Sequence, residues 1–212
     1  MNKTTIPILV LSFILSACIS MIEKGPRSYI SQAGNIKPEP SSFVFCSKYG
    51  CKEKTIINLS SESWQSVRQI FVQKALDPAQ EREQISNAIG LLETILGPIT
   101  ETENDEPGSF QGMMKHNQLD CVDESLNTTT YLVMLEEDNL ITEHTLLGPA
   151  QRGFLIDGAW PHFAPVIEEK ATGERFVVDS WFYKNGEKAV VLPLQVWKSG
   201  WKPEPETAVQ LE

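Results

Sequence analysis

The chain has 212 residues, of which 41% are hydrophobic, and its formal net charge at pH 7 is −10. This length suits one domain with a sizeable hydrophobic core. The acidic composition, without a cluster of Lys and Arg residues, excludes nucleic acid as a partner.

Residues 1–17 have the pattern of an export signal. Lys3 supplies a positive charge, and the apolar run from Ile6 to Ala17 is too short to span a bilayer as a mature helix. The run ends in Leu15-Ser16-Ala17-Cys18, which resembles the lipobox of bacterial lipoproteins. This resemblance implies cleavage before Cys18 and lipid anchoring through Cys18 in the cell envelope, with Ile19 favouring the outer membrane, facing the periplasm. The alternative is an ordinary secretory signal.

Three cysteines remain after Cys18, and exported proteins lie in an oxidising compartment. Cys46 and Cys51 enclose four residues, a loop short enough for a disulfide. This pairing leaves Cys121 as a free thiol, although Cys121 could instead pair with Cys46 or Cys51. A thiol–disulfide or metal-handling protein is a further alternative, but Cys46 and Cys51 are not spaced as Cys-x-x-Cys and the three His are scattered singly. We therefore expect no metal and no cofactor.

The predicted elements begin after the signal with residues 18–42, a segment with several Gly, Pro and Ser that is expected to be a lipidated tether. Short β-rich runs over residues 43–46 and 55–59 then predict a hairpin around the Cys loop. This hairpin is expected to open a single domain over residues 43–202, and a polar tail follows at residues 203–212.

Two helices are predicted after the hairpin. The first covers residues 61–76, and the second runs from Pro78 to the stop signal Gly97-Pro98. Asp77 is expected to cap the second helix, with Glu81 reaching back to the cap.

An acidic, solvated connection over residues 100–112 leads to a third predicted helix, residues 120–137, which Asp120 can cap. Residues 197–201 are expected to pack against a sheet through their two Trp side chains. That sheet is predicted from residues 164–168, a turn at 170–173, residues 175–182 and residues 189–194.

Cys121, His162 and Asp179 have the residue types of a cysteine acyl-transfer site: a nucleophile, a general base and a carboxylate that orients the base. Cys121 would lie in the first turn of its helix, where the helix dipole and unpaired N–H groups lower the pKa of a thiol. The position midway between His162 and Asp179 in the sequence, (162 + 179)/2 = 170.5, lies inside the predicted turn. His162 and Asp179 are therefore expected to be directly opposed on neighbouring strands, with Cβ atoms about 5 Å apart.

The oxyanion hole of such a site needs hydrogen-bond donors, and the Cys121 N–H is one. His116, five residues before Cys121, is a secondary candidate base, and His144 is expected at a surface connection. The candidate side-chain donors, in order of preference, are Gln118, then Asn117 or Trp160.

Acidic residues around Cys121 oppose a thiolate, because nearby negative charge disfavours ionisation of the thiol. They are expected to point away, to accept backbone N–H groups, or to be met by a cation such as Arg152 or Arg175. The acidic residues concerned are Asp120, Asp123 and Glu124.

Residues 110–185 resemble the transglutaminase-like branch of the papain-like cysteine peptidase superfamily. The resemblance rests on Cys121 at the start of a helix, His162 before a β-rich stretch, and Val178-Asp179 before aromatic residues. It implies an α+β fold in which a central helix bearing the Cys packs on an antiparallel sheet bearing the His and the Asp. The local sequence departs from the family, because Phe163 follows the His where a Trp is common. The pair Asp120-Cys121 also resembles NlpC/P60 cell-wall peptidases, but Asp179 fits the transglutaminase-like spacing better.

The expected function is an envelope-anchored cysteine hydrolase or acyl-transferase. It would act on amide bonds of peptides, including peptidoglycan stem peptides, through a thioester at Cys121. The alternative is a binding or structural module of the envelope that keeps this fold without the reaction.

Overall fold

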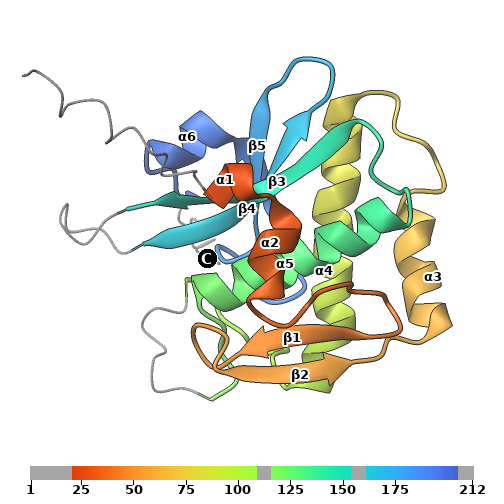
Figure 1. The fold of residues 1–212 in the computed structure, drawn as a ribbon, viewed down its shortest axis with the longest axis vertical. Coiled ribbons are helices and arrows are strands. Elements are labelled where there is room, and N and C mark those ends of the chain that lie inside the picture. Colours follow the sequence, from red (N-terminus) through yellow and green to blue (C-terminus); the bar gives the residue numbers. More distant parts are fainter. Residues whose placement is uncertain (1–20, 109–115, 154–160, 205–212) are drawn as a thin grey trace, which may run out of the picture.

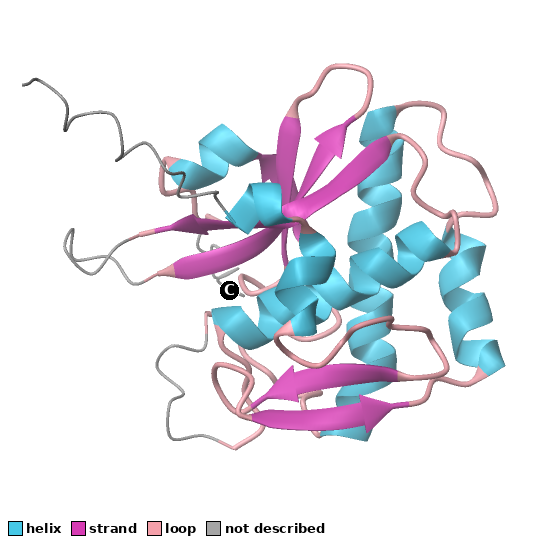
Figure 2. Ribbon diagram, in the orientation of Figure 1, coloured by secondary structure: helices cyan, strands magenta, loops and turns pink. Residues whose placement is uncertain are grey.

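A computed structural model describes residues 21–108, 116–153 and 161–204. The expected signal, the lipidation site Cys18 and the oxyanion candidate Trp160 lie outside these residues. Helices and two antiparallel sheets form a mixed structure, which confirms the predicted α+β class (Figure 1, Figure 2). Within the described ranges, none of the helices combines the length and the apolar character needed to cross a membrane.

The four-stranded sheet has the order β3-β4-β5-β6, and the β1-β2 hairpin forms a separate sheet. Helix α5 lies between the two sheets, in contact with β1 on one side and with β3, β4 and β5 on the other (Figure 1). In chain order the elements are α1 (Met21–Lys24), α2 (Pro26–Ser31), β1 (Phe43–Ser47), β2 (Glu53–Ile57), α3 (Ser61–Ile70), α4 (Pro78–Thr100), α5 (Cys121–Glu137), β3 (His144–Arg152), β4 (His162–Glu169), β5 (Arg175–Asp179), β6 (Val190–Pro193) and α6 (Leu194–Lys198).

The N-terminal helices belong to the folded body, where the sequence predicted a tether. Helices α1 and α2 both contact β3, and α2 also contacts α5. The side chains of Ile22, Tyr29 and Ile30 are buried in these contacts. A Cβ atom at Gly148 of β3 would lie 1.9 Å from the Met21 carbonyl oxygen, so only Gly allows α1 to approach so closely. The buried side chains of α1 and α2, which include Pro26, dock this otherwise polar segment.

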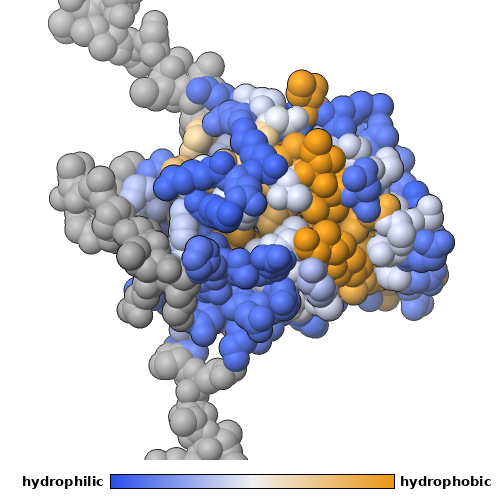
Figure 3. All heavy atoms as spheres, turned by 90° about the horizontal axis from the view of Figure 1, so that it is seen from below, coloured by the Kyte–Doolittle hydropathy of each residue, from blue (hydrophilic) through white to orange (hydrophobic). Residues whose placement is uncertain are grey.

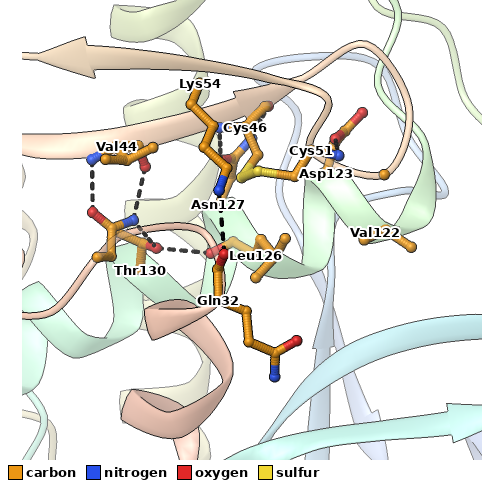
Figure 4. The surroundings of a disulfide bond; sticks show 12 residues. Gln32, Val44, Cys46, Cys51, Lys54, Val122, Asp123, Leu126, Asn127 and Thr130 are labelled. Atoms are coloured by element: carbon orange, nitrogen blue, oxygen red, sulfur yellow. Dashed lines mark hydrogen bonds between the residues drawn. A yellow bond between two sulfur atoms is a disulfide. The ribbon is translucent and has the colours of Figure 1, made fainter.

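The predicted hairpin is formed by β1 and β2, and the Cys46–Cys51 disulfide is confirmed. Two Asn side chains hold the outer edge of β1. Asn35 donates to the Val44 carbonyl at 2.8 Å and accepts the Val44 N–H at 2.6 Å. Asn127 of α5 makes the same two bonds with Cys46, at 2.9 and 2.8 Å (Figure 4). The two amides take the place of a neighbouring strand, and Asn127 ties the hairpin to α5.

Helix α3 ends at Ile70, earlier than the predicted end at residue 76. The side-chain amide of Gln84 donates to the carbonyls of Ile70 and Gln73, at 3.1 and 2.7 Å, and so holds the connection to α4. Asp77 caps α4 as predicted, and its carboxylate accepts the Gln80 N–H at 2.8 Å.

The predicted stop at Gly97-Pro98 is wrong, because α4 continues to Thr100. Pro98 removes one hydrogen bond within the helix, because it has no N–H to donate to the carbonyl four residues earlier. The Thr100 hydroxyl donates to a carbonyl one turn earlier at 3.0 Å, and the Thr102 N–H donates to the Gly97 carbonyl at 2.9 Å. These bonds satisfy the carbonyl groups of the last turn and stabilise it past Pro98.

Strand β3 is an element that the sequence did not predict. Its middle, Gly148-Pro149, has the composition of a turn. In the fold these two residues lie where the register of β3 against β4 shifts, between Leu147 and Ala150. Such an irregularity accommodates a Pro, which cannot donate a ladder hydrogen bond.

Glu81 does not reach back to its helix cap but binds the beginning of β3. Its carboxylate accepts the Thr142 N–H at 2.7 Å, the His144 N–H at 3.1 Å and a proton from His144 Nδ1 at 2.8 Å. His144, which was expected at the surface, is 1% exposed. Burial opposes the ionisation of Glu81, but the hydrogen bonds from His144 and Thr142 outweigh it and lower its pKa to about 2.

We expect Glu81→Gln to lower the free energy of unfolding by about 3 kcal/mol, because it removes one partner of a buried charged network. Urea denaturation at pH 7 measures this loss. The matched control is Glu83→Gln on the same helix, whose exposed carboxylate pairs with Lys188 and whose loss should cost less than about 1 kcal/mol. Equal losses in the two variants would contradict the role given to Glu81.

The surface is largely polar, but an apolar area lies on the face seen from below (Figure 3). Two elements at the bottom of Figure 1, β2 and the end of α4, carry exposed hydrophobic side chains. Ile56 is 69% exposed and Ile99 is 55% exposed. The hairpin side of α5 is opposite the four-stranded sheet, so these side chains lie away from the strands that carry His162 and Asp179.

Candidate active site

Cys121 is the first residue of α5, and Asp120 caps this helix as predicted. The Asp120 carboxylate accepts the N–H groups of Val122 and Asp123 at 3.1 and 2.9 Å. Asp123 in return accepts the Asp120 N–H at 3.3 Å, which completes a capping box. This local signal therefore fixes where the helix begins and places the thiol in its first turn.

His162 and Asp179 come together across β4 and β5. The His162 Nε2 atom lies 2.7 Å from Asp179 Oδ2. The strands pair Val166 with Val177, so the turn is centred at (166 + 177)/2 = 171.5, one position later than predicted. The two side chains are therefore diagonal neighbours, and the prediction of direct pairing is wrong. A displacement of two residues keeps both on one face of the sheet, and their length lets them meet.

Asp179 Oδ2 accepts a second hydrogen bond, from the indole Nε1 of Trp197 at 2.7 Å. Trp197 is fully buried on α6, and the sequence predicted only that it packs against the sheet. The available signal was the indole N–H, which usually finds an acceptor when Trp is buried. Arg152, opposite His162 in the β3–β4 pairing, donates to the Trp197 carbonyl at 2.6 Å and lies over its ring. The Asp179 carboxylate is therefore held by His162 Nε2 and by Trp197 Nε1, and Arg152 holds Trp197 in turn.

Aromatic rings surround His162. The ring centroids of Trp181, Phe182 and Trp197 lie 4.5, 5.5 and 5.5 Å from the imidazole centroid. These rings shield the His162–Asp179 hydrogen bond from water, which strengthens it. The other imidazole nitrogen, Nδ1, is buried and has no hydrogen-bond partner in the part of the chain that the structure describes.

The Cys121 thiol lies against the residues on either side of His162. Its sulfur donates to the Pro161 carbonyl at 3.5 Å, and the side chain is 5% exposed. Burial, followed by the charge of Asp120, raises the pKa of Cys121 to about 12, although a backbone hydrogen bond from Phe163 acts in the opposite direction. The predicted lowering of this pKa is wrong, because burial outweighs the effect of the helix terminus. The resting site therefore holds a neutral thiol.

The carboxylates beside Cys121 accept backbone N–H groups from the disulfide loop. Asp123 accepts the N–H groups of Tyr49 and Cys51, at 2.8 and 2.6 Å. Asp120 accepts the Gly50 N–H at 3.1 Å. Of the arrangements expected from the sequence, these two residues adopt the one in which backbone N–H groups compensate the charge.

The two arginines considered for the same role act elsewhere. Arg152 donates to the carbonyls of Trp197 and Trp201. Arg175 pairs with Glu168 at 2.8 Å on the neighbouring strand. Backbone dipoles, and not these cations, therefore offset the negative charge near Cys121.

Glu124, one turn after Cys121, belongs to a group of buried carboxyl groups. Its Oε2 atom accepts the hydroxyl of Ser180, directly after β5, at 2.6 Å. Burial, together with repulsion between the carboxyl groups, raises the pKa of Glu124 well above its usual value, that of Glu93 to about 8 and that of Asp105 to about 7. No group of His, Cys, Asp and Glu suited to a metal ion occurs within the described ranges. This environment favours the protonated form of Glu124, and its hydrogen bond with Ser180 links α5 to the end of the strand that bears the orienting Asp.

The side chains suggested for the oxyanion hole have other contacts. Gln118 donates to the carbonyls of Asn104 and Asn117, at 2.9 and 3.3 Å, and accepts the Glu106 N–H at 3.0 Å. Both of its amide protons are engaged, so donation to an oxyanion would require one of these bonds to break. Asn117 and the secondary candidate base His116 are exposed and line a surface hollow beside the disulfide loop.

Comparisons of this chain with protein-family models, with curated proteins and with solved structures found no match. The proposed function therefore rests on the geometry around Cys121 and His162.

Proposed function

We propose that this chain is a cysteine hydrolase or acyl-transferase that acts on amide bonds of peptide substrates, with a transglutaminase-like Cys121–His162–Asp179 triad. One observation carries the proposal. His162 is held by Asp179 through Nε2, its buried Nδ1 atom has no partner among the described residues, and Cys121 contacts the carbonyl of Pro161, the residue before His162. An imidazole that is oriented on one side and unpaired on the other has the form of a general base.

The proposed reaction begins with a neutral thiol and a neutral imidazole. Because Asp179 accepts the Nε2 proton, Nδ1 carries the lone pair. The Cys121 thiol turns from the Pro161 carbonyl to Nδ1 when substrate binds, since catalytic hydrogen bonds commonly tighten only in the complex. Nδ1 takes the thiol proton, the sulfur attacks the carbonyl carbon, and the proton then passes to the leaving amine.

The resulting thioester is resolved by a second nucleophile. Water gives hydrolysis, and an amine of a second substrate gives acyl transfer. The Cys121 N–H at the start of α5 is the proposed main-chain donor to the oxyanion. The reaction uses no cofactor.

The proposed location follows from the lipobox at Cys18, which would anchor the chain in the outer membrane. Peptide substrates in that compartment include peptidoglycan stem peptides, and nucleic acid is excluded by the acidic composition.

A peptide vinyl-sulfone probe tests the proposal. We expect it to label wild-type protein at Cys121, to leave Cys121→Ser unlabelled, and to label His162→Ala at least about a hundredfold more slowly, since a general base contributes about 10² to 10⁴ in rate. His116→Ala is the matched control and should react like wild type. Absence of labelling in folded wild type, or equal rates with and without His162, would refute the proposal.

The burial of Cys121 favours a second candidate function, a binding or structural module of the envelope without catalysis. A buried free Cys behaves as a small hydrophobic side chain. Under this alternative the probe does not react, and Cys121→Ser retains the binding of the partner protein or cell-wall fragment.

A further inference from the structure

The loop closed by the Cys46–Cys51 disulfide has an unusual backbone. Its residues Lys48, Tyr49, Gly50 and Cys51 have φ angles of 63°, 62°, 72° and 57°. Three of the four are not Gly, and left-handed backbone is unfavourable for such residues. A run of this kind persists only where surrounding contacts determine it.

The contacts that determine this loop are on α5, beside the thiol. Successive N–H groups of Tyr49, Gly50 and Cys51 converge on the carboxylates of Asp120 and Asp123. Such a series of N–H groups forms a concave site for anions. Here the anions are two side chains of the protein itself, one before Cys121 and one two residues after it.

The same loop is attached to α5 at its other end. Cys46 exchanges two hydrogen bonds with Asn127, while the Cys51 N–H binds Asp123, one helical turn earlier (Figure 4). The disulfide joins these two attachment points. The loop therefore spans the first two turns of α5, and its covalent closure keeps the N–H groups in place.

The charge that this loop compensates acts on Cys121. The Asp120 carboxylate is the strongest electrostatic influence that raises the pKa of the thiol, after burial itself. Asp123 is completely buried, and burial together with the Asp120 charge raises its pKa to about 7, although the N–H groups of Cys51 and Tyr49 act in the opposite direction. Without the loop, the two carboxylates would keep only the N–H groups of the helix cap, and the thiolate would form beside a less compensated Asp120 charge.

We propose that the disulfide loop, residues 47–51, is a positioning element of the thiol site, whose backbone N–H groups offset the Asp120 and Asp123 carboxylates and so maintain the reactivity of Cys121. This inference deepens the proposed function and rests on it, in that Cys121 is taken as the nucleophile. It predicts that the intact Cys46–Cys51 bond is needed for full thiol reactivity, although neither sulfur takes part in the reaction.

The test is the pH dependence of Cys121 alkylation by iodoacetamide in the full chain. In Cys46→Ala/Cys51→Ala we expect the midpoint to rise by at least about one pH unit and the rate at pH 7.5 to fall about tenfold, because one pKa unit is a factor of ten in the thiolate population. Simple loosening of the structure would expose the sulfur and increase the rate. An unchanged midpoint or a faster reaction would therefore overturn the proposal. Lys48→Ala is the matched control, since it changes an exposed side chain of the loop and keeps every N–H group.

A second pair of variants tests the route through the carboxylates. Asp120→Asn/Asp123→Asn removes both charges and keeps a good helix cap, so the midpoint should fall below that of wild type. Adding the two Cys→Ala changes to this variant should shift the midpoint no further, because coupled residues are not additive. A full further shift would overturn the proposal even where the disulfide variant alone folds poorly.

The readout is independent of catalysis. Iodoacetamide reacts with any accessible thiolate, and the ¹³Cβ chemical shift of Cys121 follows its ionisation where alkylation is slow. A loss of His162 dependence with the vinyl-sulfone probe therefore refutes the enzyme, whereas an unchanged Cys121 midpoint after removal of the disulfide refutes the role of the loop.

Discussion

Asp179→Asn is expected to slow acylation of Cys121 by about a thousandfold or more, the scale seen when the orienting carboxylate of a triad is made an amide. Asp179 Oδ2 accepts hydrogen bonds from both His162 Nε2 and Trp197 Nε1. An Asn carbonyl oxygen in the place of Oδ2 would keep both hydrogen bonds but would carry no negative charge to stabilise the imidazolium that forms when His162 takes the thiol proton. The proposed transfer of the thiol proton to Nδ1 would then lose the charge that stabilises its product.

The measurement is the second-order rate of vinyl-sulfone labelling as a function of pH. Trp197→Phe is the matched control, because it removes one donor to Asp179 and leaves the carboxylate and the tautomer unchanged. We expect a loss of about tenfold in that variant, on the scale of one hydrogen bond to a charged group. Wild-type rates in a folded Asp179→Asn protein would exclude the triad.

Glu124→Gln is expected to reduce the loss of stability that the wild-type protein shows as the pH becomes alkaline. Burial raises the pKa of Glu124 well above the ordinary value of a Glu, near 4.5, and that of Glu93 to about 8. The folded state therefore binds more protons than the unfolded state over this window. Stability is full below about pH 4.5 as far as these groups are concerned, and it is lost as the pH rises through the folded-state values.

Thermal unfolding between pH 5 and pH 9 measures this effect. Wild type should lose stability across the range, and Glu124→Gln, which can still accept the Ser180 hydroxyl, should lose much less. Glu103→Gln, in the exposed connection after α4, is the control and should follow wild type. Parallel curves for wild type and Glu124→Gln would contradict the assignment. Glu81 acts in the opposite sense, because its low pKa makes its contribution disappear only as the pH falls toward 2.

Local sequence signals predicted the parts of the fold that local interactions determine. The Asp77 and Asp120 caps are short-range hydrogen bonds, and each begins its helix where the sequence indicated. The Cys46–Cys51 pair closes a loop within one hairpin. The shared face of His162 and Asp179 was predictable because strand periodicity survives an error of two residues in the register.

The remaining features depend on contacts that the sequence does not display. Helices α1 and α2 are stable through packing on β3, and a short helix has little stability of its own. Glu81 near the start of α4 resembles a capping residue, yet its partners are 61 to 63 positions away. The neutral state of Cys121 follows from burial by distant segments, which no helix-terminus argument contains.

The hydrogen bonds of the Asn35 and Asn127 amides have a consequence for the aggregation of the protein. An unpaired strand edge is a template on which other chains can add strands and aggregate. These two side chains occupy the edge of β1 and so deny it to other chains. On the other strand of the hairpin, Lys54 places a charge beside the exposed Ile56, a feature that discourages edge-to-edge association. Asn127 holds the disulfide loop through Cys46, so this amide would serve both the loop and the separation of neighbouring copies.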